Sequence, residues 1–288
     1  MLLTINNDQI RAEISTLNGE IVSVKNNYGH EYFWSGNEWK YHAPVLFPIC
    51  GRVKDFKYTY KGKEYELKQH GFTRGSEFAV ESHNGDTIIL TLSENEETLK
   101  VYPFHFLLTL KYRIVDNSLV CEFSVKNTSR EPLPFMIGWH PAFLLEGSSP
   151  LSSFKVDFGK NADLKIRPLT PTNFIERYTL PFATDNGKYR LNTEDIINYR
   201  TLTFENTKGY ARIFSDSEPH SVTLTWSNNV PYFSIWKIPE EEVRFICLEP
   251  WSGLPSDGTE AEDFETKPDM IKLSPGSVEV FNFSATFN

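Results

Sequence analysis

Apolar and polar positions alternate with a period of two along much of the chain. Between residues 108 and 114 every second residue is apolar, and the same alternation resumes from 119 to 125 after a polar turn. This pattern is typical of half-buried strands, and a short polar turn between two of them predicts a hairpin. Strands are likewise expected on both sides of Asn18-Gly19, Lys61-Gly62-Lys63 and Pro275-Gly276, at 11–15, 20–25, 58–60, 64–67, 271–273 and 278–283.

The rest of the chain also favours strands over helices. Further strands are expected at 87–92, 211–214, 221–226, 232–238 and 243–248, short helical turns near 193–199 and 261–265, and long loops at 147–153, 169–193 and 251–269. No long stretch has the apolar period of about 3.6 residues that marks a helix. The sequence therefore predicts an all-β fold, a large antiparallel sandwich or barrel, as a single domain over residues 1–288.

Composition narrows the class of protein. The 288 residues carry 38 acidic and 29 basic side chains, for a net charge of −9, which argues against a general affinity for nucleic acid or an anionic membrane. No apolar run is long enough to cross a bilayer, and no secretory signal is visible at the start. Cys50, Cys121 and Cys247 are scattered and form no metal-binding or disulfide pattern. We expect a cytoplasmic protein with neither a nucleic-acid nor a membrane partner; its oligomeric state is left open.

Several donor side chains stand in positions suited to a binding cleft. No phosphate-binding loop, dinucleotide fingerprint, HExxH or GxSxG motif is present. Arg52 follows an apolar stretch, although a surface arginine that bridges loops explains it better when it is taken alone. Gln69, His70 and Arg74 are donors suited to sugar hydroxyls, and Gly71 beside them permits a close backbone approach. A turn with incidental polar residues explains this second segment equally well.

Two ionisable residues lie in strongly apolar segments. His140 is enclosed by aromatic and aliphatic residues, as a proton donor or a satisfied core histidine would be. Glu249 closes the apolar strand 243–248, where burial would raise its pKa toward that of a general base; a strand-end carboxylate facing water is the alternative. Aromatic residues make up 14% of the chain and mostly fit core packing, yet Trp236 and Trp251 are candidates to stack on a sugar ring.

Five segments, in this order, resemble the aldose 1-epimerase (galactose mutarotase) family, and more closely its LacX-like branch. They read FPICGRV at 47–53, KQHGFTRGSEF at 68–78, PFMIGWHPAF at 134–143, YFSIWKIP at 232–239 and FICLEPWSGLPS at 245–256. With the hairpin patterns at both ends, the resemblance covers nearly the whole chain. Each motif is modest, but the ordered set is specific. The resemblance implies a large antiparallel β-supersandwich of the galactose mutarotase type.

The resemblance also implies an activity and a division of roles. Glu249 matches the general base, His140 the general acid, and Arg52 and His70 the residues that hold hydroxyls around the ring oxygen. A substrate-contacting Asp is common in the family between the histidine and the glutamate. Here Arg200 stands at the corresponding position, with Asp195 nearby, so substrate choice is less defined than reaction type.

The expected enzyme is an isomerase that interconverts sugar anomers, with a sugar as its partner. One group removes the proton from O1 and another protonates the ring oxygen from the opposite side of the pyranose, and neither step needs a metal or another cofactor. The alternatives are a non-catalytic carbohydrate-binding or sugar-sensing protein, a glycoside hydrolase or lyase, and a metal site built from His70, His140 and Glu249. The preferred sugar, and whether it carries a 6-phosphate, is left open.

Overall fold

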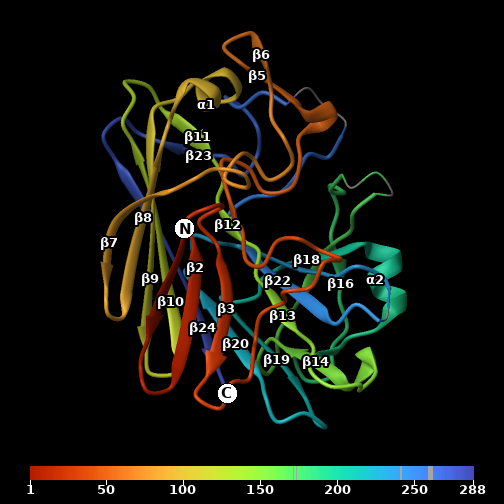
Figure 1. Ribbon diagram of the computed structural model, residues 1–288. Coiled ribbons are helices and arrows are strands. Elements are labelled where there is room, and N and C mark those ends of the chain that lie inside the picture. Colours follow the sequence, from red (N-terminus) through yellow and green to blue (C-terminus); the bar gives the residue numbers. More distant parts are fainter. Residues whose placement is uncertain (171, 173, 241, 259–261) are drawn as a thin grey trace.

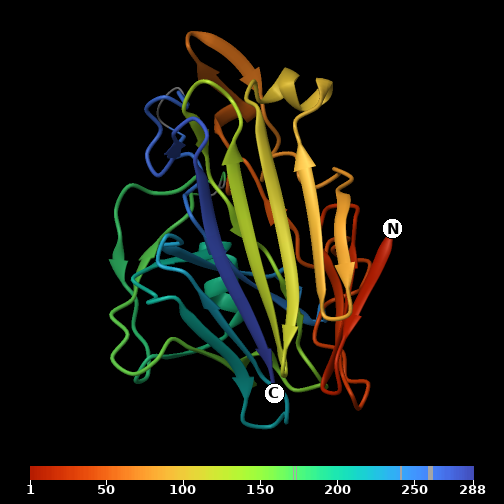
Figure 2. The same cartoon turned by 90° about the vertical axis from the view of Figure 1, so that its left-hand side faces the viewer.

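Two large antiparallel sheets dominate the computed structural model, which describes residues 1–170, 172, 174–240, 242–258 and 262–288 (Figure 1). The nine-stranded sheet runs in the order β17 (Lys188–Arg190), β14 (Phe154–Asp157), β19 (Tyr210–Ser215), β20 (Val222–Trp226), β24 (Val278–Phe287), β10 (Ser118–Asn127), β9 (Phe106–Val115), β8 (Thr87–Ser93) and β7 (Ala79–Asn84). Its long central strands are seen in Figure 2. Phe123 of β10 lies opposite both Leu110 of β9 and Phe281 of β24. Every second residue of β10 is buried, so one face of this sheet packs against the core.

The eight-stranded sheet carries the residues of greatest chemical interest. Its order is β16 (Leu180–Pro181), β15 (Lys165–Arg167), β18 (Thr201–Glu205), β21 (Tyr232–Trp236), β22 (Phe245–Trp251), β12 (Gly138–Trp139) and β4 (Val45–Leu46), and β13 (Ala142–Leu144) also pairs with β22. Every residue of β22 is buried. Burial on both faces explains why this strand is almost continuously apolar instead of alternating.

Smaller elements surround the two sheets. They are a three-stranded sheet of β1 (Leu2–Asn6), β2 (Ile10–Ser15) and β3 (Ile21–Asn26), the pairs β5 (Lys57–Tyr60) with β6 (Lys63–Glu66) and β11 (Leu133–Phe135) with β23 (Ile271–Leu273), the helices α1 (Glu96–Val101) and α2 (Thr193–Tyr199), and the 3₁₀ turns η1 (Lys54–Phe56) and η2 (Leu151–Ser153). Figure 1 shows α2 beside β18, on the side away from β7 to β10. Among the described residues, no helix has the length and apolar character needed to cross a membrane.

A large cluster of buried apolar side chains extends from Leu3 to Phe287 and joins the sheets. A second, smaller cluster consists of Trp34, Ala142, Val243, Phe245 and Cys247. The prediction of an all-β antiparallel supersandwich is confirmed. The predicted hairpins around Asn18, Lys61 and Asp116 are present, as is the short helix at 193–199.

Several local predictions are wrong. The strands on either side of Pro275-Gly276 do not pair with each other, because β23 pairs with β11 while β24 lies between β10 and β20. The loop expected at 169–193 contains β16 and β17. No helix forms at 262–265, where Asp263 bridges to Thr59; Ala261 lies outside the described residues.

The strand predicted at 243–248 begins at Phe245 and continues to Trp251, so Glu249 lies inside it and not at its end. A proline within a central strand would normally forfeit a ladder hydrogen bond. The N–H of Leu248 donates to the carbonyl of Pro141. Backbone groups two residues apart point to the same side of a strand, so the nitrogen of Pro250 also points toward the segment that contains Pro141. Regular pairing on that side is interrupted between β12 and β13, and Pro250 therefore fits the strand at little cost.

Candidate active site

A cavity of about 670 Å³ lies over one face of the eight-stranded sheet. Its walls include all eight residues proposed from the sequence: Arg52, Gln69, His70, Arg74, His140, Trp236, Glu249 and Trp251. Thr201 and Trp236 lie opposite each other on β18 and β21, and Glu249 and Trp251 lie two residues apart on β22. Alternation along the strands therefore directs these side chains to the same face of the sheet.

Glu249 and His140 are in contact at the base of this cavity. Nε2 of His140 lies 3.0 Å from Oε2 of Glu249, and the two residues are 6% and 1% exposed. Among the described residues, three atoms of the pair have no partner in hydrogen-bonding geometry. They are both carboxyl oxygens of Glu249 and Nδ1 of His140. Buried polar atoms are rarely left in this state without a functional reason. The pair therefore has unused capacity to bond to a ligand.

Burial moves the pKa values of the two groups in opposite directions. It raises the pKa of Glu249 well above its ordinary value, against a smaller opposing effect of the Arg74 guanidinium. Burial lowers the pKa of His140, and the charge of Arg74 lowers it further. Both shifts favour uncharged forms in a site of low polarity. Near neutral pH the pair therefore holds one titratable proton, and it titrates as a unit.

His70 is held in one tautomer by the neighbouring backbone. The N–H of Gly51 donates to Nδ1 of His70 at 3.0 Å, so the ring proton resides on Nε2. Burial, then the charges of Arg74 and His140, lower the pKa of His70, so the ring is neutral. The turn needs Gly71 at φ +78°, where a Cβ would lie 2.0 Å from the carbonyl oxygen of Phe47. His70 thus offers a single fixed N–H donor.

Two arginines contribute cationic donors to the walls. Arg52 donates from Nη2 to the carbonyl of Thr172 at 2.6 Å, and its guanidinium lies 4.6 Å from the centroid of the Phe174 ring. Arg74 donates from Nη2 to the carbonyl of Gln69 at 2.7 Å and lies 4.9 Å from the centroid of the Tyr41 ring. A guanidinium has five N–H donors, so these contacts leave donors on each arginine for a ligand.

Sequence reasoning missed Trp39, which covers the histidine. Its ring stacks on His140 with centroids 5.0 Å apart and planes at 26°, and its centroid lies 5.6 Å from that of Trp236. The available signal was the density of aromatic residues in the segment YFWSGNEWKY at 32–41. Of the two tryptophans proposed from the sequence, Trp236 is partly exposed, whereas Trp251 is only 4% exposed. Trp39 and Trp236 therefore present more aromatic surface to the cavity than Trp251 does.

Arg200 lines the cavity, and Asp195 is not among its lining residues. Asp195 lies in the first turn of α2 and bonds to residues just before that helix. It accepts hydrogen bonds from Tyr189 Oη at 2.9 Å and from Asn192 Nδ2 at 2.7 Å. Arg200 ends α2 with φ +59°, a left-handed conformation that is uncommon for arginine. Lys237 also lines the cavity, and its Nζ donates to the carbonyls of Ile238 and Glu240.

The metal-ligand set considered from the sequence does not assemble. Potential ligand atoms of His140, Cys247 and Glu249 lie within 4.8 Å of one another, and His70 is not in this group. The Nδ1 atom of His70 is already an acceptor for Gly51. Burial raises the pKa of Cys247 well above its ordinary value, so in the metal-free protein this side chain is a thiol.

Comparison with known proteins gives concordant matches over nearly the whole length. The family model described as aldose 1-epimerase matches residues 1–278. The plasmid-encoded protein LacX of Lactococcus lactis is 29% identical over 303 aligned residues, which cover 96% of this chain and 95% of the relative. The crystal structure of a galactose mutarotase related enzyme from Lactobacillus acidophilus superimposes with a TM-score of 0.93 at 33% identity, covering 100% of this chain and 97% of that chain. A galactose mutarotase-like protein from Lactobacillus casei also gives 0.93, at 28% identity and with 100% of both chains covered.

Proposed function

Because the chain belongs to the aldose 1-epimerase family, we propose that it interconverts the α and β anomers of a hexose or a related sugar. The contact between Nε2 of His140 and Oε2 of Glu249, 3.0 Å long and buried, is the observation that carries the proposal. The pair lies in a cavity of about 670 Å³, within the usual range for small-molecule sites of about 300–1,000 Å³. An acid and a base beside each other are what proton exchange on a sugar requires.

The direct contact changes the expected arrangement of acid and base. A pyranose does not fit between groups that are 3.0 Å apart, so the expectation that they act from opposite sides of the ring does not suit this geometry. O1 and the ring oxygen are both bonded to C1 of the sugar. Glu249 and His140 can therefore serve the two oxygens from the same end of the ring.

The single proton of the pair is sufficient for a complete cycle. The unprotonated partner accepts the O1 proton while the C1–ring-oxygen bond breaks, and the protonated partner donates its proton to the ring oxygen. A C1 aldehyde and a free hydroxyl result. Rotation about C1–C2 presents the other face of the aldehyde, and the ring closes with the two roles reversed. The reaction ends with the pair in a singly protonated state, ready for another turnover.

The walls supply binding and charge stabilisation. The Nε2–H of His70 and the guanidinium groups of Arg52 and Arg74 suit the negative charge that develops on the ring oxygen, because fixed donors stabilise such charge effectively. Trp39 and Trp236 suit the apolar C–H surface of a pyranose. Arg52 and Gln69 are donors for the remaining hydroxyls.

The test is a mutarotation assay on freshly dissolved pure anomers of glucose and galactose, followed by polarimetry and by NMR of the anomeric protons. The proposal predicts a first-order approach to equilibrium that is faster than the spontaneous reaction and proportional to enzyme concentration. A protein that binds these sugars yet leaves the spontaneous rate unchanged would be a carbohydrate-binding protein on the same fold. Hydrolase activity would instead release new reducing ends from a glycoside.

A further inference from the structure

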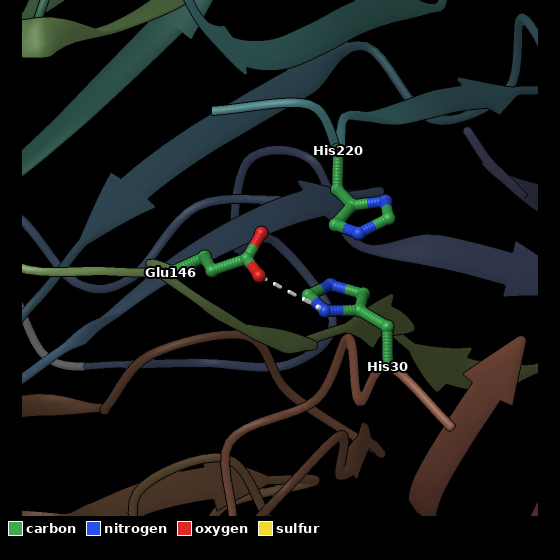
Figure 3. Close-up of side chains that lie close together, drawn as sticks. All are labelled: His30, Glu146 and His220. Carbon is green, nitrogen blue, oxygen red and sulfur yellow. Dashed lines mark ion pairs between the residues drawn. The ribbon is translucent and has the colours of Figure 1, made fainter. Parts of the chain in front are cut away.

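A second cluster of polar side chains lies outside the candidate active-site cavity. It consists of His30, Glu146 and His220, which converge from three separate segments (Figure 3). His30 follows β3 of the three-stranded sheet, in a turn where Asn26 Oδ1 accepts its backbone N–H at 3.0 Å. Glu146 follows β13, which pairs with the eight-stranded sheet, and His220 precedes β20 of the nine-stranded sheet. One potential ligand atom from each residue lies within 4.8 Å of the other two.

The spacing of these atoms suits a shared ion better than a hydrogen bond. Nδ1 of His30 lies 3.3 Å from Oε1 of Glu146, the contact marked in Figure 3, whereas charge-assisted hydrogen bonds measure about 2.7–2.9 Å. Two ligands of a tetrahedral zinc ion are about 3.3 Å apart, given bonds of about 2.0–2.1 Å. The rings of His30 and His220 stack with centroids 3.7 Å apart and planes at 21°. For both imidazoles to ligate one ion, this stack has to open.

Two of the three side chains, Glu146 and His220, retain unused bonding capacity. Oε2 of Glu146 is buried and has no hydrogen-bond partner in the part of the chain that the structure describes. Within the same part, no hydrogen bond reaches either ring nitrogen of His220.

We propose that His30, Glu146 and His220 form a binding site for a divalent transition-metal ion such as Zn²⁺. Two imidazoles and one carboxylate suit zinc and its neighbours in the first transition row, whereas Mg²⁺ and Ca²⁺ prefer oxygen ligands alone. Glu146 and His220 also line a small hollow of about 30 Å³, which His30 does not line. It shares no lining residue with the larger cavity.

The consequence of occupancy is a cross-link between three sheets. The ligands come from segments next to β3, β13 and β20, so one ion ties together parts of the fold that are distant in the sequence. An ion that binds the folded but not the unfolded chain stabilises the fold by mass action. The site is therefore expected to raise thermal stability and to have no direct part in sugar chemistry.

Calorimetric titration of Zn²⁺ into full-length protein, freed of metal by a chelator and then by buffer exchange, tests the site. We expect one ion per chain and a higher melting temperature with Zn²⁺. His30→Gln and His220→Gln should each weaken binding at least about tenfold, since losing even an outer-shell partner costs about 10–100-fold. His105→Gln is the matched control, because His105 pairs with Glu94 at 2.7 Å on the surface without a second histidine. Its Zn²⁺ affinity should be unchanged.

Equal Zn²⁺ affinity in the wild-type protein, His30→Gln and His220→Gln would overturn the proposal, as would the absence of Zn²⁺ binding to the wild-type protein. Loss of binding in Cys247→Ser alone would assign the ion to the group with His140 and Glu249 instead. Should a histidine variant fail to fold, Co²⁺ in the wild-type protein decides the question. Nitrogen and oxygen ligands give visible bands without thiolate charge transfer, and a strong thiolate band would contradict the proposed ligands.

Discussion

The imidazole of His140 contacts Glu249 through Nε2 and Oε2, 3.0 Å apart, while the indole of Trp39 stacks on the same imidazole. The carboxylate is thus bordered by a histidine, and the histidine by an aromatic ring. This enclosure produces the opposed pKa shifts of the two groups. The two groups are best understood as one unit that shares a proton.

The pH dependence of catalysis should report that unit. Unperturbed values of 4.5 for glutamate and 6.5 for histidine would confine the singly protonated state to the interval between them. A raised Glu249 pKa preserves this state at higher pH, and a lowered His140 pKa preserves it at lower pH. We expect kcat/KM for mutarotation, corrected for the spontaneous rate, to stay nearly constant from about pH 5 to about pH 8. A loss of activity centred on about pH 6.5 would contradict the account.

Replacing the buried carboxyl should stabilise the protein at alkaline pH. Glu249 has a higher pKa in the folded than in the unfolded chain, so its stabilising effect is complete below the unfolded value and is lost as pH rises through the folded value. The amide in Glu249→Gln does not titrate. Relative to wild type, the variant's free energy of unfolding should increase by at least about 1 kcal/mol between pH 5 and pH 9, since one pKa unit corresponds to about 1.4 kcal/mol. Urea denaturation at both pH values measures this. Glu64→Gln is the surface control, because Glu64 pairs with Lys57, which stays charged at both pH values. An equal difference at both pH values would refute the prediction.

The tryptophans should separate into two groups by phenotype. Trp39 and Trp236 are partly exposed in the cavity, so Trp39→Leu and Trp236→Leu should each raise the KM for the sugar by about 3–10-fold, the scale of a lost aromatic contact. Trp251 is 4% exposed, and Trp251→Leu should chiefly lower stability, by at least about 1 kcal/mol. Steady-state kinetics and thermal melts distinguish the two. Unchanged KM values in folded Trp39→Leu and Trp236→Leu proteins would exclude stacking.

The acid and base should be strongly coupled in a double-mutant cycle. His140→Asn removes one partner and Glu249→Gln the other, and either change disables the shared proton. The double variant should therefore lose much less than the product of the two single losses in kcat, as for residues that act as a unit. Multiplicative losses would indicate that the two groups act independently.

The sequence predicted the fold well wherever burial is one-sided. The hairpin of β9 and β10 was recognised because one face of each strand is apolar. In contrast, β7 is mostly exposed, so its apolar and polar residues do not alternate. The helix α1 has only six residues, and it depends on a local capping box between Asn95 and Thr98. The pairing of β23 with β11 arises from tertiary packing, which local turn signals do not encode.

The sequence predicted which residues line the candidate site but not how they are arranged in it. Ordered motifs identified eight residues that line one cavity, because ionisable groups in apolar segments are conspicuous. Trp39 was missed because it lies outside any regular strand pattern. The contact between His140 and Glu249 depends on the register of β22 against β12 and β13, which the sequence alone does not define.

The mutarotation rate of Glu249→Gln is the most direct test of the central claim. The amide keeps the shape of the side chain but can neither donate nor accept a proton in the exchange, so kcat should fall by roughly 10²-fold or more, while sugar affinity measured by calorimetry changes far less. Glu94→Gln, which alters a carboxylate paired with a surface histidine, should keep wild-type kcat. A folded Glu249→Gln protein that catalyses mutarotation at a near-normal rate would contradict the account.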